Sequence, residues 1–178
     1  NLQGLLKKGL LYYHLENNKL ANESIDLAKK TYPNSKEVYL YRASLLAKST
    51  EKYDEALKII DSALQIDPSY IGAYIEQGSV YNSQNKYFEA INSFSKAIDI
   101  DSLNEDLYSS RAIVFYRIDS IILALNDYQK VIELDPEKLL AHYDIGVIKC
   151  KIDLFEDAIM SFEKVLEIDS TNVNAINY

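Results

Sequence analysis

Residues 71–104 read IGAYIEQGSVYNSQNKYFEAINSFSKAIDIDSLN, and residues 105–138 read EDLYSSRAIVFYRIDSIILALNDYQKVIELDPEK. The two stretches have the same pattern of small and large apolar residues at an offset of 34. A fixed offset of this size is typical of repeat proteins, which must be recognised before domains are counted. Four columns carry it: Ala56, Ala90, Ala124 and Ala158; Ile60, Phe94, Tyr128 and Phe162; Ala63, Ala97, Val131 and Val165; and Pro68, Ser102, Pro136 and Ser170.

The same columns continue toward the N-terminus with one residue inserted. Ala21, Ile25, Ala28 and Pro33 keep the spacing at an offset of 35, and the insertion is placed at Ser49-Thr50-Glu51. We therefore expect residues 1–178 to form one array, with repeats at 2–35, 36–70, 71–104, 105–138 and 139–172 and an incomplete sixth at 173–178.

Each repeat is predicted to contain two helices. In the third repeat, apolar residues at helical spacing run from Tyr74 to Tyr81, stop at Asn85-Lys86, and resume from Ala90 to Ile98. Asp-Pro at 67–68 and 135–136 predicts the end of a second helix, because proline disfavours a helical residue before it. No segment alternates apolar and polar residues as a strand would, so the fold class is all-α.

These residues resemble the tetratricopeptide repeat family, over residues 2–172. The resemblance implies a right-handed α-solenoid of stacked helical hairpins, whose first helices line a concave groove. Tryptophan, usual at one position, is replaced by Tyr or His, and Lys149 stands at an aromatic position. The first-helix landmarks are Leu5/Gly9/Tyr12, Tyr39/Ala43/Leu46, Tyr74/Gly78/Tyr81, Tyr108/Ala112/Phe115 and His142/Gly146/Lys149.

Composition excludes several classes of function. The chain is 48% hydrophobic and 26% charged, which fits a folded protein, and its net charge of −8 disfavours nucleic acid as a partner. Its single cysteine, Cys150, allows no intrachain disulfide and no multi-cysteine zinc site. We expect no membrane insertion within this segment, which carries no targeting signal and is placed in the cytoplasm by default.

The residues left for ligand binding follow from the helical angle of 100° per residue. In each first helix, positions 2, 5, 6, 9, 12 and 13 point away from the packing face. Some of these side chains could instead contact the next repeat, and both interpretations stay open. The predicted peptide-binding groove comprises Leu6, Leu10, Tyr13, Leu40, Tyr41, Ser44, Ile75, Glu76, Ser79, Asn82, Ser109, Ile113, Tyr116, Tyr143, Asp144 and Val147.

The charges on the first helices are ordered along each helix. Acidic residues lie in the first halves, and Lys48, Arg117 and Lys151 lie at the ends. Complementarity to the helix dipole explains this order, and a groove with one acidic and one basic rim is the alternative. The lysines, arginine and asparagines that would clamp a free C-terminal carboxylate are missing, since Leu6, Leu40 and Ile75 stand at such positions.

Nothing in the sequence indicates catalysis. His14 and His142 are the only histidines, Cys150 has no adjacent base, and no phosphate-binding glycine loop or metal-ligand cluster is present. We expect no enzyme activity, no cofactor and no metal. The function predicted is a module that binds a peptide or helix of a partner protein; the alternative is a structural or oligomerisation scaffold that positions a catalytic or sensor domain.

A further expectation concerns the C-terminal end. Val173, Ile176 and Tyr178 begin a repeat that is not completed, which would leave Phe162, Val165 and Leu166 partly covered. We therefore expect weak self-association through this end.

Overall fold

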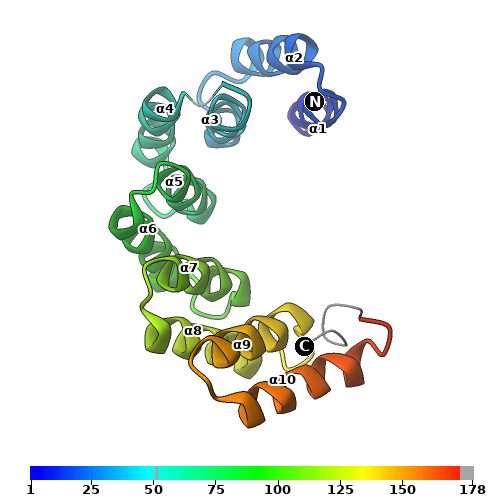
Figure 1. Ribbon diagram of the computed structural model, residues 1–178. Coiled ribbons are helices and arrows are strands. Elements are labelled where there is room, and N and C mark those ends of the chain that lie inside the picture. The colour runs from blue at the N-terminus through cyan, green and yellow to red at the C-terminus, as the bar shows by residue number, and fades with distance from the viewer. Residues whose placement is uncertain (51, 173–178) are drawn as a thin grey trace. The chain divides into compact units, whose positions relative to one another are not determined.

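The computed structural model describes residues 1–50 and 52–172, which form ten α-helices and no strand (Figure 1). Consecutive helices pack against each other as hairpins, as the prediction of two helices per repeat indicates. Their bounds are α1 (Leu2–His14), α2 (Asn18–Thr31), α3 (Lys36–Thr50), α4 (Tyr53–Ile66), α5 (Ile71–Ser83), α6 (Tyr87–Ile100), α7 (Glu105–Arg117), α8 (Ile121–Leu134), α9 (Leu139–Lys151) and α10 (Phe155–Ile168).

The helices divide into two compact units. The first comprises Asn1–Ser93 and the second begins at Phe94, so the division falls within α6. We call them the N-terminal unit and the C-terminal unit. Helix α3 has 15 residues where α5 has 13, which places the additional length of the second repeat in its first helix. Residue 51 and the beginning of the predicted sixth repeat, 173–178, lie outside the described residues.

Left-handed residues close the turns within the hairpins. Glu16, Asn85, Asp119 and Asp153 have φ angles of 57°, 58°, 60° and 61°. Asn and Asp adopt this conformation more readily than other residues that carry a Cβ, so three of the four turns use a favoured residue type. The predicted break at Asn85-Lys86 is thus a turn between α5, which ends at Ser83, and α6, which begins at Tyr87.

An aspartate column ends the second helices. Helices α4 and α8 end at Ile66 and Leu134, directly before the Asp-Pro pairs, as predicted. The carboxylates of Asp67 and Asp135 accept hydrogen bonds from backbone N–H groups two residues later, at 3.0 and 3.2 Å. Asp101 and Asp169 do the same where the next residue is serine. The Asx turn therefore follows α4, α6, α8 and α10, with or without proline, whereas α2 ends at Thr31 before Tyr32-Pro33.

The core lies between the two helices of each hairpin. The alanines predicted to mark closest approach, from Ala21 to Ala158, are 0 to 1% exposed. Large residues four positions later fill the remaining space: Ile25, Ile60, Phe94, Tyr128 and Phe162 are each no more than 5% exposed. Small and large columns alternate, and this gives close packing within the hairpins.

Candidate peptide-binding site

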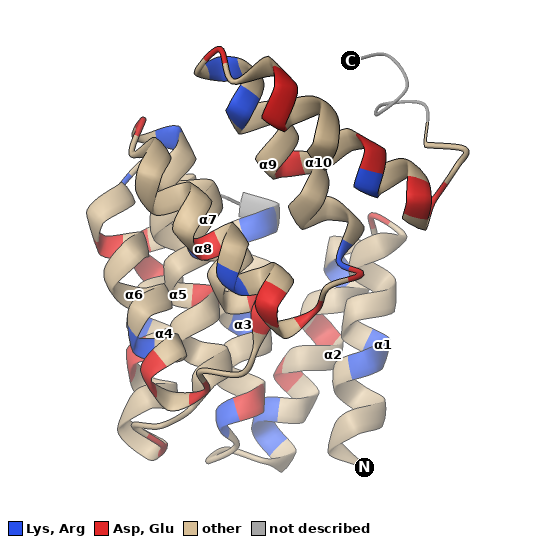
Figure 2. Cartoon of the chain, turned by 90° about the horizontal axis from the view of Figure 1, so that it is seen from below, with Lys and Arg blue, Asp and Glu red and all other residues tan. Residues whose placement is uncertain are grey.

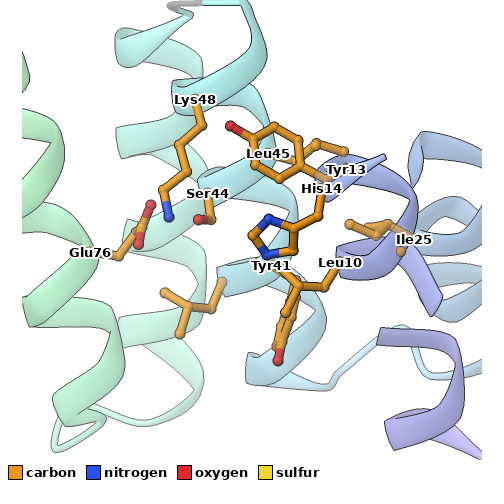
Figure 3. A pocket seen from close by; sticks show the side chains of 11 residues that line it. Leu10, Tyr13, His14, Ile25, Tyr41, Ser44, Leu45, Lys48 and Glu76 are labelled. Atoms are coloured by element: carbon orange, nitrogen blue, oxygen red, sulfur yellow. The ribbon is translucent and has the colours of Figure 1, made fainter. Parts of the chain in front are cut away.

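A pocket opens between the first helices of three consecutive hairpins in the N-terminal unit. It has a volume of about 290 Å³, and α1, α3 and α5 contribute most of its lining (Figure 3). Six of the predicted groove residues line it: Leu10, Tyr13, Leu40, Tyr41, Ser44 and Glu76. An adjoining hollow of about 270 Å³ shares Tyr13 and Glu76 and adds the predicted Ser79.

The lining is largely apolar because helical spacing brings one residue per turn to the same side. Leu10 follows Leu6 by one turn on α1 and is 42% exposed at the pocket mouth. The floor is formed by Ile25 and Leu45, which belong to the buried cluster beneath. An apolar side chain that entered here would exchange water contacts for packed aliphatic and aromatic surface.

One wall of the pocket is polar. Figure 3 shows Ser44, Lys48 and Glu76 converging there from α3 and α5. Burial raises the pKa of the Glu76 carboxyl group, while the positive charge of Lys48 and a hydrogen bond from the Ser44 hydroxyl oppose the shift. The carboxylate is thus partly desolvated and held in place, and it can accept further hydrogen bonds from a ligand.

Two polar residues of the pocket stand outside the predicted list of groove residues: His14, and Lys48, which was predicted only as one of the charges at the ends of the first helices. Lys48 and His14 occupy the same repeat position, 34 residues apart, at the ends of α3 and α1. Figure 3 shows His14 and Tyr13 on the side of the pocket opposite Glu76. The helical angle could have identified both residues from the sequence, because His14 and Lys48 stand one turn after the groove residues Leu10 and Ser44.

One predicted groove residue is wrong. Leu6 is 0% exposed and belongs to a buried cluster with Ala28 and Val38, so it cannot contact a ligand. The remaining predictions on α5, Ile75 and Asn82, are half-buried and line neither hollow. The Ser79 hydroxyl donates to the carbonyl oxygen of Ile75 at 2.9 Å, within the helix.

In the C-terminal unit, the predicted groove residue Tyr116 is in contact with a charged side chain. The Nζ of Lys151 lies 4.8 Å from the centroid of its ring and also pairs with Asp119 at 2.6 Å. Ile113 is 42% exposed and Ser109 is half-buried, with its hydroxyl bonded to the Glu105 carbonyl oxygen. Ser109, Ile113 and Tyr116 lie on α7, and the Lys151 ammonium group stacks on the face of the Tyr116 ring.

The predicted residues on α9 contribute to packing. The Tyr143 ring lies 5.8 Å from that of Phe162, and Val147 packs on the same buried cluster. Asp144 is half-buried and accepts a hydrogen bond from the Tyr128 hydroxyl. On α9, therefore, the predicted side chains contact other helices, as in the alternative interpretation, and do not form a surface for a ligand.

The ordered charges are paired locally. Lys138 contacts Glu105 and Asp106 at 3.1 and 2.8 Å, Lys151 contacts Asp119, and Lys48 faces Glu76. Each of these lysines is therefore close to an acidic side chain. This pairing does not favour a groove with one acidic and one basic rim.

The residues considered for catalysis have structural contacts. Cys150 packs beside Phe162 and Val165, and the His142 Nε2 lies 2.9 Å from the Pro136 carbonyl oxygen. Within residues 1–50 and 52–172, no group of three or more His, Cys, Asp or Glu side chains could hold a metal ion. None of the helices in this part of the chain combines the length and apolar character needed to cross a membrane.

The architecture described so far is that of a helical-hairpin repeat protein, and sequence comparison gives the class. A family model of the tetratricopeptide repeat matches residues 38–70, and a second TPR repeat model matches residues 78–119. Together with the helical-hairpin fold, the two matches support a tetratricopeptide repeat protein. Repeats of this family are in general non-catalytic scaffolds for protein interactions. No curated protein matches the chain significantly in sequence.

Solved structures share the fold. MamA from Desulfovibrio magneticus is 17% identical, with 97% of each chain covered and a TM-score of 0.77. TTC0263, a thermophilic TPR protein of Thermus thermophilus, is 16% identical, with 99% of this chain and 96% of that chain covered and a TM-score of 0.75. PilF of Pseudomonas aeruginosa is 16% identical, with 98% of this chain and 79% of that chain covered and a TM-score of 0.82.

Proposed function

We propose that the protein is a non-catalytic interaction module that binds a peptide or helix of a partner protein in the pocket of α1, α3 and α5. The observation that carries this proposal is that three consecutive hairpins contribute side chains to one pocket with an apolar floor and a polar wall. Peptide-binding sites typically combine apolar anchors with a few polar groups that fix the register of the ligand.

The size of the pocket favours a side chain of a longer ligand over a free cofactor. At about 290 Å³ it lies at the lower end of the range of small-molecule pockets, roughly 300 to 1,000 Å³. One large apolar side chain would fill most of it. The adjoining hollow at Ser79 continues along α5 and gives the flanking residues of an extended or helical segment a place to bind.

The polar groups indicate how the ligand is oriented. The Glu76 carboxylate is an acceptor and the Lys48 ammonium is a donor on the same wall, so both N–H and C=O groups of a peptide find partners there. Because these two charges offset each other, affinity should depend little on salt, unlike binding to nucleic acid. A free C-terminal carboxylate lacks the cluster of cationic donors that it would need.

Selection of peptides from a random phage-displayed library on the 178-residue chain would test this proposal. We expect the selected peptides to carry a large apolar residue and to lose affinity for Leu10→Asp by about 1 kcal/mol or more, about fivefold. Leu10 is 42% exposed, so the substitution leaves the core intact.

Leu11→Asp is the matched control, because Leu11 is 59% exposed on the same helix and does not line the pocket. Equal loss of affinity in both variants, or none in either, would place the binding surface elsewhere. Peptides selected without an apolar residue would contradict the role assigned to the apolar floor.

The scaffold alternative has its own supporting observation. Apolar side chains are exposed on α1 and on α10, outside the pocket, at Leu11, Phe155 and Ile159. A module that assembles through its ends would need such surfaces.

A further inference from the structure

Helix α1 presents a face that is buried in every later first helix. Leu11 is 59% exposed, whereas its counterparts in the later repeats, Leu45, Val80, Val114 and Ile148, are 7, 2, 0 and 2% exposed. Two of those counterparts pack on the second helix of the preceding hairpin: Leu45 clusters with Ala21 and Ile25 of α2, and Val80 belongs to a cluster with Ala56 and Ile60 of α4. We call Lys8 and Leu11 the α1 face.

Helix α10 presents the complementary surface. Phe155 and Ile159 are 54 and 56% exposed. Their counterparts are half-buried in α4 (Tyr53 and Leu57) and in α8 (Ile121 and Leu125), and each of these helices packs against the first helix of the following hairpin. We call Phe155, Ile159 and Glu163 the α10 face.

The sequence-based expectation for this end was partly wrong. Of the three residues predicted to be partly covered, Leu166 is half-buried as expected, but Phe162 and Val165 are 5 and 0% exposed, because α9 packs over them through Leu139, Tyr143 and Val147. The exposed apolar surface lies one to two helical turns before Phe162, at Ile159 and Phe155. Residues 173–178, on which that expectation also depended, lie outside the described part of the chain.

A polar contact recurs where a first helix meets the preceding second helix. Arg42 contacts Asp26 at 3.5 Å, and Gln77 contacts Asp61 at 3.4 Å, each across 16 residues. Arg111 makes the equivalent contact to Ser95 at 2.8 Å. In this pattern Lys8 stands at the position of Arg42, and Glu163 stands at the position of Asp61.

The charges of the two helices are complementary. Helix α1 contains Lys7 and Lys8 and no acidic residue, whereas α10 contains four acidic residues and one lysine. Figure 2 shows blue segments on α1 and mainly red segments on α10. Opposite signs at the two faces favour contact between them and disfavour contact of either face with itself.

From these relations we propose that the α1 face of one copy docks on the α10 face of a second copy, in the register that joins successive hairpins within the chain. In that register Leu11 meets Ala158 and Phe162, the counterparts of the Ala21 and Ile25 that Leu45 contacts, with Ile159 next to Ala158, and Lys8 lies opposite Glu163. The contact is heterologous, since each copy contributes a different face. It buries one helix on another, a small interface, so the association is weak and depends on protein concentration.

Sedimentation of the 178-residue chain over a range of concentrations tests this proposal. We expect the average mass of the unmodified chain to rise with concentration, and Leu11→Asp and Ile159→Asp alone to stay at the monomer mass of 20.4 kDa. Because each variant keeps one intact face, an equimolar mixture should recover association and stop at two chains. Circular dichroism should be unchanged, since both residues are more than half exposed.

Three results would overturn the proposal. If Leu11→Asp still associates while Ile159→Asp does not, α10 meets α10 and the contact is isologous. If the mixture of variants stays monomeric, the two faces do not bind each other. If the unmodified chain stays monomeric to its solubility limit, the α1 and α10 faces do not join copies of the chain in solution.

Charge exchange tests the register. Lys8→Glu or Glu163→Lys should weaken association roughly two- to fivefold, the range of a surface ion pair, and the double variant should restore it. Leu10→Asp serves as the control here, because Leu10 belongs to the peptide pocket and not to the α1 face. We expect Leu10→Asp to lose peptide binding and keep self-association, and Leu11→Asp to lose self-association and keep peptide binding. These opposite outcomes keep the two proposals separate.

Discussion

The Nε2 of His142 lies 2.9 Å from the carbonyl oxygen of Pro136, six residues earlier in the chain. Since a carbonyl oxygen can only accept, this nitrogen is the donor of the hydrogen bond. Tyr108 and Tyr74 make the equivalent bond through their hydroxyls, to Ser102 at 3.2 Å and to Pro68 at 3.0 Å. The ring therefore ties the first helix to the turn that precedes it, and histidine replaces tyrosine without loss of the bond.

We expect His142→Tyr to leave the free energy of unfolding unchanged within about 0.5 kcal/mol, and His142→Ala to lower it by about 1 to 2 kcal/mol. The alanine variant loses both the hydrogen bond and the packing of the ring. Urea titration followed by circular dichroism measures both. A tyrosine variant as unstable as the alanine variant would show that the imidazole has a role that tyrosine cannot fill.

A second prediction concerns the bridge between α7 and α8. Arg111 donates two hydrogen bonds of 2.8 Å to the Asp127 carboxylate, and the side chains are only 20 and 9% exposed. Asp127→Ser should lower the free energy of unfolding by about 2 to 4 kcal/mol, because it leaves a largely buried guanidinium group without its carboxylate.

The preceding repeat supplies the compensating change. Gln77 and Ser93 occupy the positions of Arg111 and Asp127, and their side chains are joined by a hydrogen bond of 3.0 Å. The double variant Arg111→Gln/Asp127→Ser should recover at least half of the loss, although the stacking of Arg111 on Phe115 at 5.7 Å disappears. Additive losses in the two single variants would rule out the coupling inferred from the geometry.

A third prediction concerns the closest approach of α9 and α10. A Cβ atom on Gly146 would lie 2.6 Å from the Phe162 ring, which is 5% exposed. Gly146→Ala should lower the free energy of unfolding by about 1 to 3 kcal/mol through overpacking. Adding Phe162→Leu should relieve the clash, so that the double variant is less destabilised than the sum of the two single changes. A strictly additive urea midpoint shift would argue against the contact.

The helices and their turns could be predicted from sequence because each repeat restates the same pattern. The alanine column from Ala21 to Ala158 fixes where helices meet, and the Asp-Pro pairs fix where second helices end. The aspartate column at 67, 101, 135 and 169 was also visible in the sequence. It explains why serine can follow at 102 and 170 without loss of the turn.

The candidate site was less predictable, because the helical angle tells which side of a helix a residue faces but does not tell how deeply other parts of the fold bury it. Leu6 and Leu10 lie on the same side of α1, yet Leu6 is 0% and Leu10 is 42% exposed. The difference arises from Ala28 and Val38, which lie next to Leu6 only in the folded hairpins. For the same reason, sequence alone could not assign Tyr143 to the packing against Phe162.

The last prediction follows from Asp144, the counterpart of Glu76 in the C-terminal unit. Burial raises the pKa of its carboxyl group above the ordinary value of 3.8, and the hydrogen bond from Tyr128 only partly opposes this. The folded chain therefore binds the proton more tightly than the unfolded chain. The stability contribution of Asp144 then falls as pH rises from about 3.8 through the folded-state pKa, and the charged form is unfavourable at neutral pH.

Asp144→Asn keeps an acceptor for the Tyr128 hydroxyl and removes the charge. We expect this variant to have a higher urea midpoint than the unmodified chain at pH 7, with the difference shrinking as pH falls through the folded-state pKa and levelling off below about pH 4, where Asp144 is protonated in both the folded and the unfolded chain. Tyr128→Phe, which removes the donor, should shift the midpoint in the opposite direction at pH 7. A difference between the Asn variant and the unmodified chain that stays constant from pH 7 to pH 3 would mean that the carboxyl group titrates alike in the folded and unfolded chains, and that burial does not act on it as the structure implies.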